Sequence, residues 1–303
     1  RGIAMVTFLQ LLVSGIGMGC IYCMVAIEYT LIWNASGLVN FGHEKFIMLG
    51  AYIFAGTLML KLGVPSGAAI LITILIMFLF GALTAVGVFN PLSRLNSNIF
   101  AVMGTLMLSE VLNEAARLIW GPAPFNLPDF IKGSYNVGGV SIPKVYAVIV
   151  VVSMLLLVSI HLMFKMTKVG RAMRCVAQDK KAAALMGINV NANIMLTVGL
   201  SAAICCIIGI LIIPILNVKL TMASVIALKG FSAGIVGGFG SIPGAIVGGL
   251  LIGRRKPIYG RRTFRLPGRR RVRASDWLPA CQAGGHSEKE NRQSLGGRRD
   301  EKI

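Results

Sequence analysis

The sequence has few charged residues for its length. Only 14% of its 303 residues are Asp, Glu, Lys or Arg, whereas 55% are hydrophobic, and the mean hydropathy is +0.76. A soluble domain of this size needs a mostly polar surface, and so few charged side chains cannot supply one. The composition therefore predicts an integral membrane protein with several spans.

Acidic residues are scarcer still, with 11 Asp and Glu against 30 Lys and Arg, a formal net charge of +19. Such an excess could indicate a nucleic-acid partner. Half of the basic residues, however, lie in 254–303, and most of the others lie between apolar runs, as membrane topology requires. We therefore predict a lipid bilayer, and no nucleic acid, as the partner.

The usual signatures of catalysis are missing. The sequence has no G-x-x-x-x-G-K-[S/T], H-E-x-x-H or G-x-S-x-G motif and only three histidines. We predict no enzyme activity, no cofactor and no metal site, and any ATP used for transport must be hydrolysed by another subunit. The cysteines show no metal-ligand spacing; they are Cys20, Cys23, Cys175, Cys205, Cys206 and Cys281.

Long apolar runs are abundant, and a bilayer core of roughly 30 Å selects runs of about 20 residues. They cover about 3–32, 46–60, 68–89, 99–119, 145–164, 194–216 and 222–252. The run at 46–60 is short for a span, and the run at 222–252 is long and rich in glycine. The predicted fold class is an all-α polytopic bundle with re-entrant or broken helices.

Polar residues and glycines interrupt the apolar sequence at Gly37–Tyr52 (GLVNFGHEKFIMLGAY). Non-helical backbone at membrane depth survives only where it is buried in protein or lines a wet cavity. The stretch is therefore a candidate broken helix at a translocation path. A cytoplasmic loop of about ten residues fits the composition equally well.

A second interruption is predicted in the run Gly237–Gly249 (GGFGSIPGAIVGG). Pro243 and the preceding glycines disfavour a continuous helix there. We expect a short re-entrant element at Leu228–Gly238 and a helix from about Ile242. The alternative is a tight helix–helix seam, because small residues four apart let two helices approach closely.

Ionisable residues within the apolar runs are candidate functional groups. Glu110 and Glu114 share one helical face, and Arg117 lies three residues beyond Glu114. As an alternative to a functional role, Glu114 and Arg117 could simply form an interfacial pair beside Trp120. Glu28, near the end of the first run, could likewise be interfacial.

The segment from Lys165 to Lys181 carries six basic residues against one acidic residue, and this asymmetry predicts a cytoplasmic loop. Lys180–Met186 is expected to be helical, with Gly187 as its stop. A short helix in this place suits docking into a groove of a soluble partner. A solvated connecting helix is the alternative.

Three segments together resemble the permeases of branched-chain amino acid ABC importers of the LivH/LivM type. Gly37–Tyr52 is similar to the family's L-N-F-A-H-G-x-F-x-M-L-G-A-Y segment. Gly170–Asn189 is similar to G-R-A-x-R-A-x-A-x-D-x-x-A-A-x-L-x-G-I-N. Leu228–Gly253 is similar to L-K-A-F-x-A-x-V-L-G-G-x-G-S-I-P-G-A.

The resemblance implies the architecture of an ABC importer permease in the bacterial inner membrane. It also implies four kinds of partner: a second permease subunit, two ATP-binding-cassette ATPases, a periplasmic substrate-binding protein and the bilayer. The loop 165–193 would touch the ATPase. The residues expected to make or shape that contact are Asp179, Lys181, Ala182, Ala183 and Gly187. Lys181 departs from the wider importer pattern, which has Glu at this position.

The carboxy-terminal part departs from the family's pattern. We expect a transmembrane permease domain at 1–253 and an Arg-rich, disordered tail at 254–303, because Arg-rich sequence without apolar periodicity does not form a packed core. A frameshifted or truncated end is our hypothesis for the tail, and a lipid-binding tail is the alternative.

The predicted function is import of branched-chain amino acids by alternating access, without covalent chemistry. The alternatives are an ABC permease for urea or short amides and an ion-coupled secondary transporter. Residues expected to line or shape the path lie at the two interruptions; they are Asn40, Phe41, Gly42, His43, Gly237, Gly238, Gly240 and Pro243.

Overall fold

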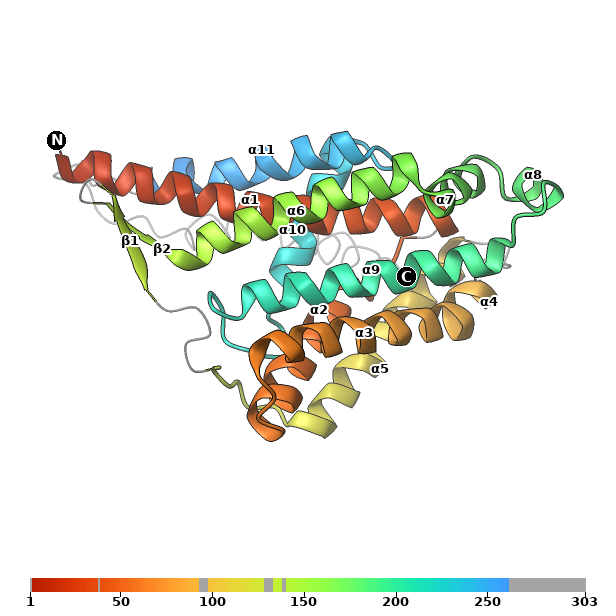
Figure 1. Cartoon of the computed structure of the whole chain (residues 1–303), viewed down its shortest axis with the longest axis horizontal. Helices are drawn as coiled ribbons and strands as arrows, with labels where there is room; N and C mark the ends of the chain where they lie inside the picture. The colour runs from red at the N-terminus through yellow and green to blue at the C-terminus, as the bar shows by residue number, and fades with distance from the viewer. Residues whose placement is uncertain (1, 38, 93–97, 128–132, 138–139, 262–303) are drawn as a thin grey trace, which may run out of the picture. The chain divides into compact units, whose positions relative to one another are not determined.

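The computed structural model describes residues 2–37, 39–92, 98–127, 133–137 and 140–261. The helices are α1 (Gly2–Ser36), α2 (His43–Ala51), η1 (Tyr52–Lys61), α3 (Ser66–Thr84), η2 (Ala85–Phe89), α4 (Asn90–Leu92), α5 (Asn98–Trp120), α6 (Lys144–Met166), α7 (Lys168–Gln178), α8 (Lys180–Leu185), α9 (Val190–Ile212), α10 (Ser224–Gly237) and α11 (Ile242–Arg261), and η1 and η2 are π-helical (Figure 1). The strands β1 (Ser134–Val137) and β2 (Val140–Pro143) pair antiparallel. The predicted all-α bundle is thus confirmed, with one small hairpin added.

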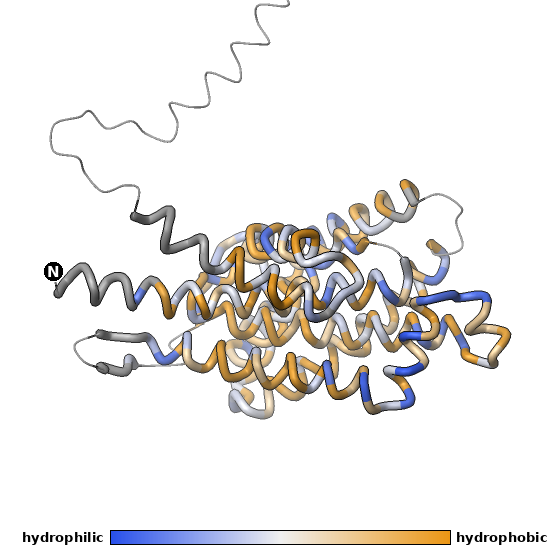
Figure 2. Tube along the Cα trace, turned by 90° about the horizontal axis from the view of Figure 1, so that it is seen from above, coloured by the Kyte–Doolittle hydropathy of each residue, from blue (hydrophilic) through white to orange (hydrophobic). Residues whose placement is uncertain are grey.

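Four helices of the described ranges are long and apolar enough to cross a membrane. They span Leu12–Ser36, Ser66–Leu92, Lys144–Met166 and Val190–Ile212. The first and last of these are mostly buried, whereas Ser66–Leu92 and Lys144–Met166 expose most of their side chains. Figure 2 shows hydrophobic residues along the outer helices as well as the inner ones. Exposed apolar helices of this length belong in lipid.

The helix α1 is the centre of the bundle, and α6, α7, α9 and α10 all pack against it. Small residues let some of the helices approach one another closely. Gly19 of α1 lies against Gly253 of α11, and Gly81 of α3 lies against Val198 and Ala202 of α9. In each case a side chain in place of the hydrogen would meet backbone or a neighbouring Cβ, so glycine permits the close approach.

The run at 46–60 belongs to one continuous helical stretch, because α2 passes into the wide turns of η1 at Tyr52 without leaving helical backbone. The run at 99–119 forms α5, whose polar residues include the predicted pair of Glu114 and Arg117, 3.4 Å apart and exposed. The helix α11 continues to Arg261, past the predicted domain boundary at 253. Most of the predicted tail, 262–303, lies outside the described residues.

Candidate functional site

The first interruption separates α1 from α2, and Asn40 and Gly42 within it are buried. α1 ends at Ser36, Gly37 follows with φ +70°, and α2 begins at His43. Asn40 is fully buried, and its Oδ1 accepts a hydrogen bond from the Gly42 N–H at 2.9 Å. Such an Asx turn replaces a backbone partner that the missing helical turn would have supplied. The segment is therefore a break within the bundle rather than a ten-residue solvated loop.

Neighbouring elements close tightly over this break. A Cβ on Gly42 would lie 3.2 Å from the Thr105 carbonyl oxygen of α5, and the Phe41 N–H donates to Thr105 Oγ1 at 3.4 Å. These contacts tie the non-helical backbone to α5. The predicted residues Asn40, Phe41, Gly42 and His43 thus lie together at one packed turn.

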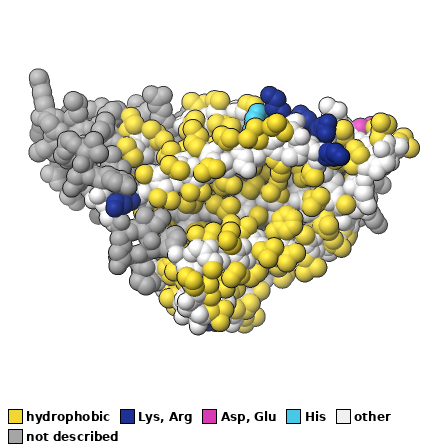
Figure 3. All heavy atoms as spheres, viewed as in Figure 1, with side chains coloured by type: hydrophobic (Ala, Val, Ile, Leu, Met, Phe, Trp, Pro, Cys, Tyr) yellow, Lys and Arg dark blue, Asp and Glu magenta, His cyan; other side chains and the backbone are white. Residues whose placement is uncertain are grey.

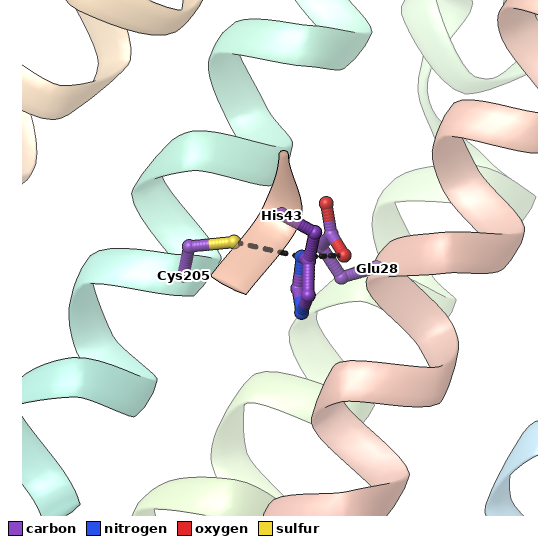
Figure 4. Close-up of side chains that lie close together, drawn as sticks. All are labelled: Glu28, His43 and Cys205. Carbon is purple, nitrogen blue, oxygen red and sulfur yellow. Dashed lines mark hydrogen bonds and ion pairs between the residues drawn. The ribbon is translucent and has the colours of Figure 1, made fainter. Parts of the chain in front are cut away.

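A polar cluster adjoins this turn, where His43 at the start of α2 meets Glu28 of α1 and Cys205 of α9 (Figure 4). His43 Nδ1 pairs with Glu28 Oε2 and lies 3.3 Å from Cys205 Sγ, and Ser201 Oγ donates to Glu28 Oε1. Glu28 and His43 are both 0% exposed. The alternative in which Glu28 is interfacial is therefore wrong: α9 and α2 cover it, and His43 supplies its partner.

The second interruption separates α10 from α11 and depends on glycine. Gly238 and Gly240 have φ of +85° and +94°, which side-chain-bearing residues rarely adopt. Pro243 falls in the first turn of α11, where its missing N–H costs no helical hydrogen bond. The break and the helix start at Ile242 are confirmed. The re-entrant boundary at Leu228 is wrong, because α10 is regular from Ser224.

The same glycines also form the helix–helix seam that was the alternative prediction. A Cβ on Gly237 would lie 2.1 Å from the Gly244 carbonyl oxygen, and one on Gly248 would lie 2.1 Å from the Ala233 carbonyl oxygen. α10 and α11 therefore touch backbone to backbone next to the turn. The break and the seam are one structure, and both interpretations of the sequence hold.

The two interruptions meet at the end of α1. Asn34 Nδ2 of α1 donates to the Gly240 carbonyl oxygen at 3.3 Å. The Phe231 ring of α10 lies 5.7 Å from Phe41 and 5.6 Å from Phe239. Tyr29 extends this aromatic cluster, with its ring 4.4 Å from His43 and 5.3 Å from Phe231.

Sequence reasoning did not predict the aromatic cluster. Its members come from α1, α10 and the two turns, so only the packing of these elements brings them together. Trp33 of α1 also belongs to the cluster, with its ring 5.9 Å from Phe239. The spacing of Tyr29 and Trp33, four apart on one face of α1, is a local signal that could have indicated it.

The predicted docking segment forms two short helices joined at Asp179. The Asp179 carboxylate caps α8 by accepting from the N–H groups of Lys181 and Ala182, at 2.7 and 3.1 Å. Gly187, with φ +81°, ends the turn as expected. Ala183 is buried, whereas Lys181 and Ala182 are exposed. Leu185 and Met186, 89% and 83% exposed, form an apolar tip that the sequence analysis did not single out.

Lys180 connects this segment to the first interruption. Its Nζ donates to the Ser36 carbonyl oxygen, the last of α1 before the break, and lies near Gly37. Partial burial there lowers the pKa of the Lys180 amine from its ordinary value. Figure 3 shows further Lys and Arg side chains gathered at the end of the molecule that carries α7.

A cavity of about 450 Å³ opens near the end of α1. It lies between the end of α1, the end of α6, α7 and the second turn, and its lining includes Asn34, Phe164, Arg174, Gly240 and Pro243. The second interruption and the basic loop therefore face one common space.

Known proteins with similar sequences share one description. Residues 11–257 match the family described as branched-chain amino acid transport system, permease component. The high-affinity branched-chain amino acid transport system permease protein LivH of Escherichia coli K12 is 31% identical over 259 residues, which cover 81% of this chain and 84% of LivH. The corresponding protein BraD of Pseudomonas aeruginosa is 33% identical over 261 residues, with the same shares.

A more distant relative is the probable branched-chain amino acid transport permease protein LivH of Methanocaldococcus jannaschii, 25% identical over 242 residues that cover 76% of this chain and 74% of that protein. No solved structure matches the chain. With a family match over most of its length and apolar helices that fit a bilayer, the chain belongs to the branched-chain amino acid transport permease family and is a multi-pass membrane protein.

Proposed function

We propose that this chain is a permease subunit of an ATP-driven importer of branched-chain amino acids in the bacterial inner membrane. Membership of the permease family over residues 11–257 carries the proposal. The permease domain corresponds to the predicted 1–253, with α11 continuing beyond it.

The translocation path is proposed to run along the two interruptions. Breaks in membrane helices give backbone groups and hinges where a substrate passes. Asn40, Phe41, Gly42 and His43 supply one wall, and Gly237, Gly238, Gly240 and Pro243 supply the other. The contact of Asn34 with Gly240 and the cluster around Phe231 support this assignment, because they make the two breaks neighbours.

The driving force is proposed to enter through α8. Two ATP-binding-cassette ATPases, a second permease subunit and a substrate-binding protein complete the importer. The exposed Lys181, Ala182, Leu185 and Met186 form the contact with the ATPase, while Asp179, Ala183 and Gly187 hold the helix in shape. Lys180 then carries a displacement of α8 to the Ser36 carbonyl at the first break.

Uptake measurements test the substrate. Cells that lack their own branched-chain amino acid importers receive this gene together with its neighbouring transport genes, and uptake of labelled leucine and of labelled urea is measured. Leucine uptake that disappears when the ATPase gene is omitted supports the proposal. Urea uptake would favour the short-amide alternative, and uptake retained without the ATPase would favour an ion-coupled transporter.

Co-purification tests the docking site. Tagged protein is expected to recover a P-loop ATPase, and Met186→Asp is expected to reduce that recovery at least tenfold, because it places a charge on an apolar contact. Met166→Asp is the matched control, since Met166 is also exposed, at 72%, but lies at the end of α6. Equal recovery with Met186→Asp and the unchanged protein would remove the docking role.

A further inference from the structure

Three potential metal ligands converge inside the bundle. Glu28, His43 and Cys205 each offer one ligand atom, these atoms all lie within 4.8 Å of one another, and all three residues are buried. The sequence analysis predicted no metal site, because the members of this group lie on α1, α2 and α9 and show no ligand spacing. His43 also belongs to the proposed wall of the translocation path, whereas Glu28 and Cys205 have no part in the proposed docking or path.

Hydrogen bonds alone do not readily satisfy both of the groups that face His43 Nδ1. Its Nδ1 faces both the Glu28 carboxylate and the Cys205 sulfur (Figure 4). One N–H can be directed well at only one acceptor. A cation between the three groups would instead accept a lone pair from each of them.

We propose that Glu28, His43 and Cys205 bind a divalent metal ion of the Zn²⁺ class. Carboxylate, imidazole and thiolate together suit a borderline-soft ion that accepts tetrahedral geometry. Ligand atoms that each lie about 2.0–2.3 Å from one Zn²⁺ are separated from each other by roughly 3–4 Å, a range that small side-chain adjustments of this group reach. Three protein ligands leave the fourth position for water or the Ser201 hydroxyl.

Charge balance also favours this ion. A divalent cation with one carboxylate and one thiolate has no net charge, which lowers the cost of burial in the bundle. On binding, the Cys205 thiol loses its proton, so the site releases a proton as it fills. Ser201 donates a hydrogen bond to the other Glu28 oxygen and so orients the carboxylate, as hydrogen-bond partners of metal ligands commonly do.

Metal retention tests the site. The full chain is expressed in zinc-supplemented medium, purified in detergent with a chelator that strips surface metal, and measured by elemental mass spectrometry. Cys281 and His286, which lie outside the described residues, are changed to Ser and Asn throughout so that they cannot contribute. We expect about one zinc per chain, and at least a tenfold loss of retained zinc with Cys205→Ser.

Cys206→Ser is the matched control, because Cys206 is the neighbouring buried cysteine of α9 and is not part of the group. It should retain zinc like the parent protein. Absence of retained zinc in the parent, or equal loss in both variants, would overturn the proposal and leave Glu28 and His43 as a buried polar pair only.

A measurement without a variant at the site covers the case in which Cys205→Ser does not fold. X-ray absorption at the zinc edge of the parent protein should show one sulfur neighbour together with nitrogen and oxygen neighbours. A spectrum with only nitrogen and oxygen neighbours would overturn the assignment of Cys205.

Discussion

The two interruptions solve the same backbone problem in opposite ways. At residues 37–42, a buried side chain replaces a missing helical bond, because Asn40 accepts from the Gly42 N–H, and His43 directly after it makes a buried contact with Glu28. At residues 238–241, positive φ angles at Gly238 and Gly240 and the backbone-to-backbone packing of α10 against α11 make the turn. The first break depends on what its side chains bind, and the second on glycine positions where no Cβ fits.

This difference predicts that the two breaks are destabilised by different kinds of substitution. Removing a partner from the first break leaves a buried polar group without compensation. Adding an atom to the second break forces two helices apart. The four substitutions below separate these effects, and each is paired with a matched position elsewhere in the chain.

The largest effect is expected for Glu28→Leu. It leaves His43 buried without its carboxylate partner, and breaking a buried pair in this way costs about 3–5 kcal/mol of unfolding free energy. Glu114→Leu breaks the exposed pair with Arg117, which is worth about 0–1 kcal/mol. Chemical unfolding in detergent measures both, and equal losses would show that burial of Glu28 is not decisive.

Gly237→Ala should come second. The new Cβ would lie 2.1 Å from the Gly244 carbonyl oxygen, where neither backbone can yield easily, so we expect a loss at the upper end of the usual overpacking cost of about 1–3 kcal/mol. Gly87→Ala, in a helical turn with open space around it, should be neutral or stabilise by about 0.5–1 kcal/mol. Thermal midpoints compare the two variants, and a harmless Gly237→Ala would refute the seam.

Asn40→Ala should cost about 1–3 kcal/mol, because the buried Gly42 N–H loses its acceptor. Asn34→Ala removes the link between the breaks, an exposed hydrogen bond of 3.3 Å that water can replace, and should cost about 0.5 kcal/mol. Both are read from unfolding midpoints. If Asn34→Ala proved the more harmful, the link would matter more than the buried turn.

The smallest effect concerns pH. Burial lowers the pKa of Lys180 below its ordinary value of 10.5. Between the lowered pKa and 10.5 the unfolded chain binds more protons than the folded one, so the stability contributed by this group rises with pH across that window. Lys180→Met should remove this rise, whereas Lys181→Met, at an exposed neighbour, should keep it. Thermal midpoints recorded across the alkaline range test the difference.

Local sequence signals predicted much of the backbone. Gly187 as a helix stop, the start of α11 at Ile242 and the break after Gly37 each depend on a few adjacent residues whose conformational limits are strong. What could not be predicted is where side chains from distant helices meet. Glu28 shares a site with Cys205 only because α1 and α9 pack at one particular rotation, and no local pattern encodes that rotation.

The position of Lys180 has a thermodynamic consequence for the proposed importer. Its amine holds the Ser36 carbonyl, so any partner that draws α8 away must also release the end of α1. Two equilibria linked through one contact influence each other by the same factor. If ATPase docking favours one arrangement of the first break, then an amino acid that prefers that arrangement must tighten ATPase docking by an equal factor.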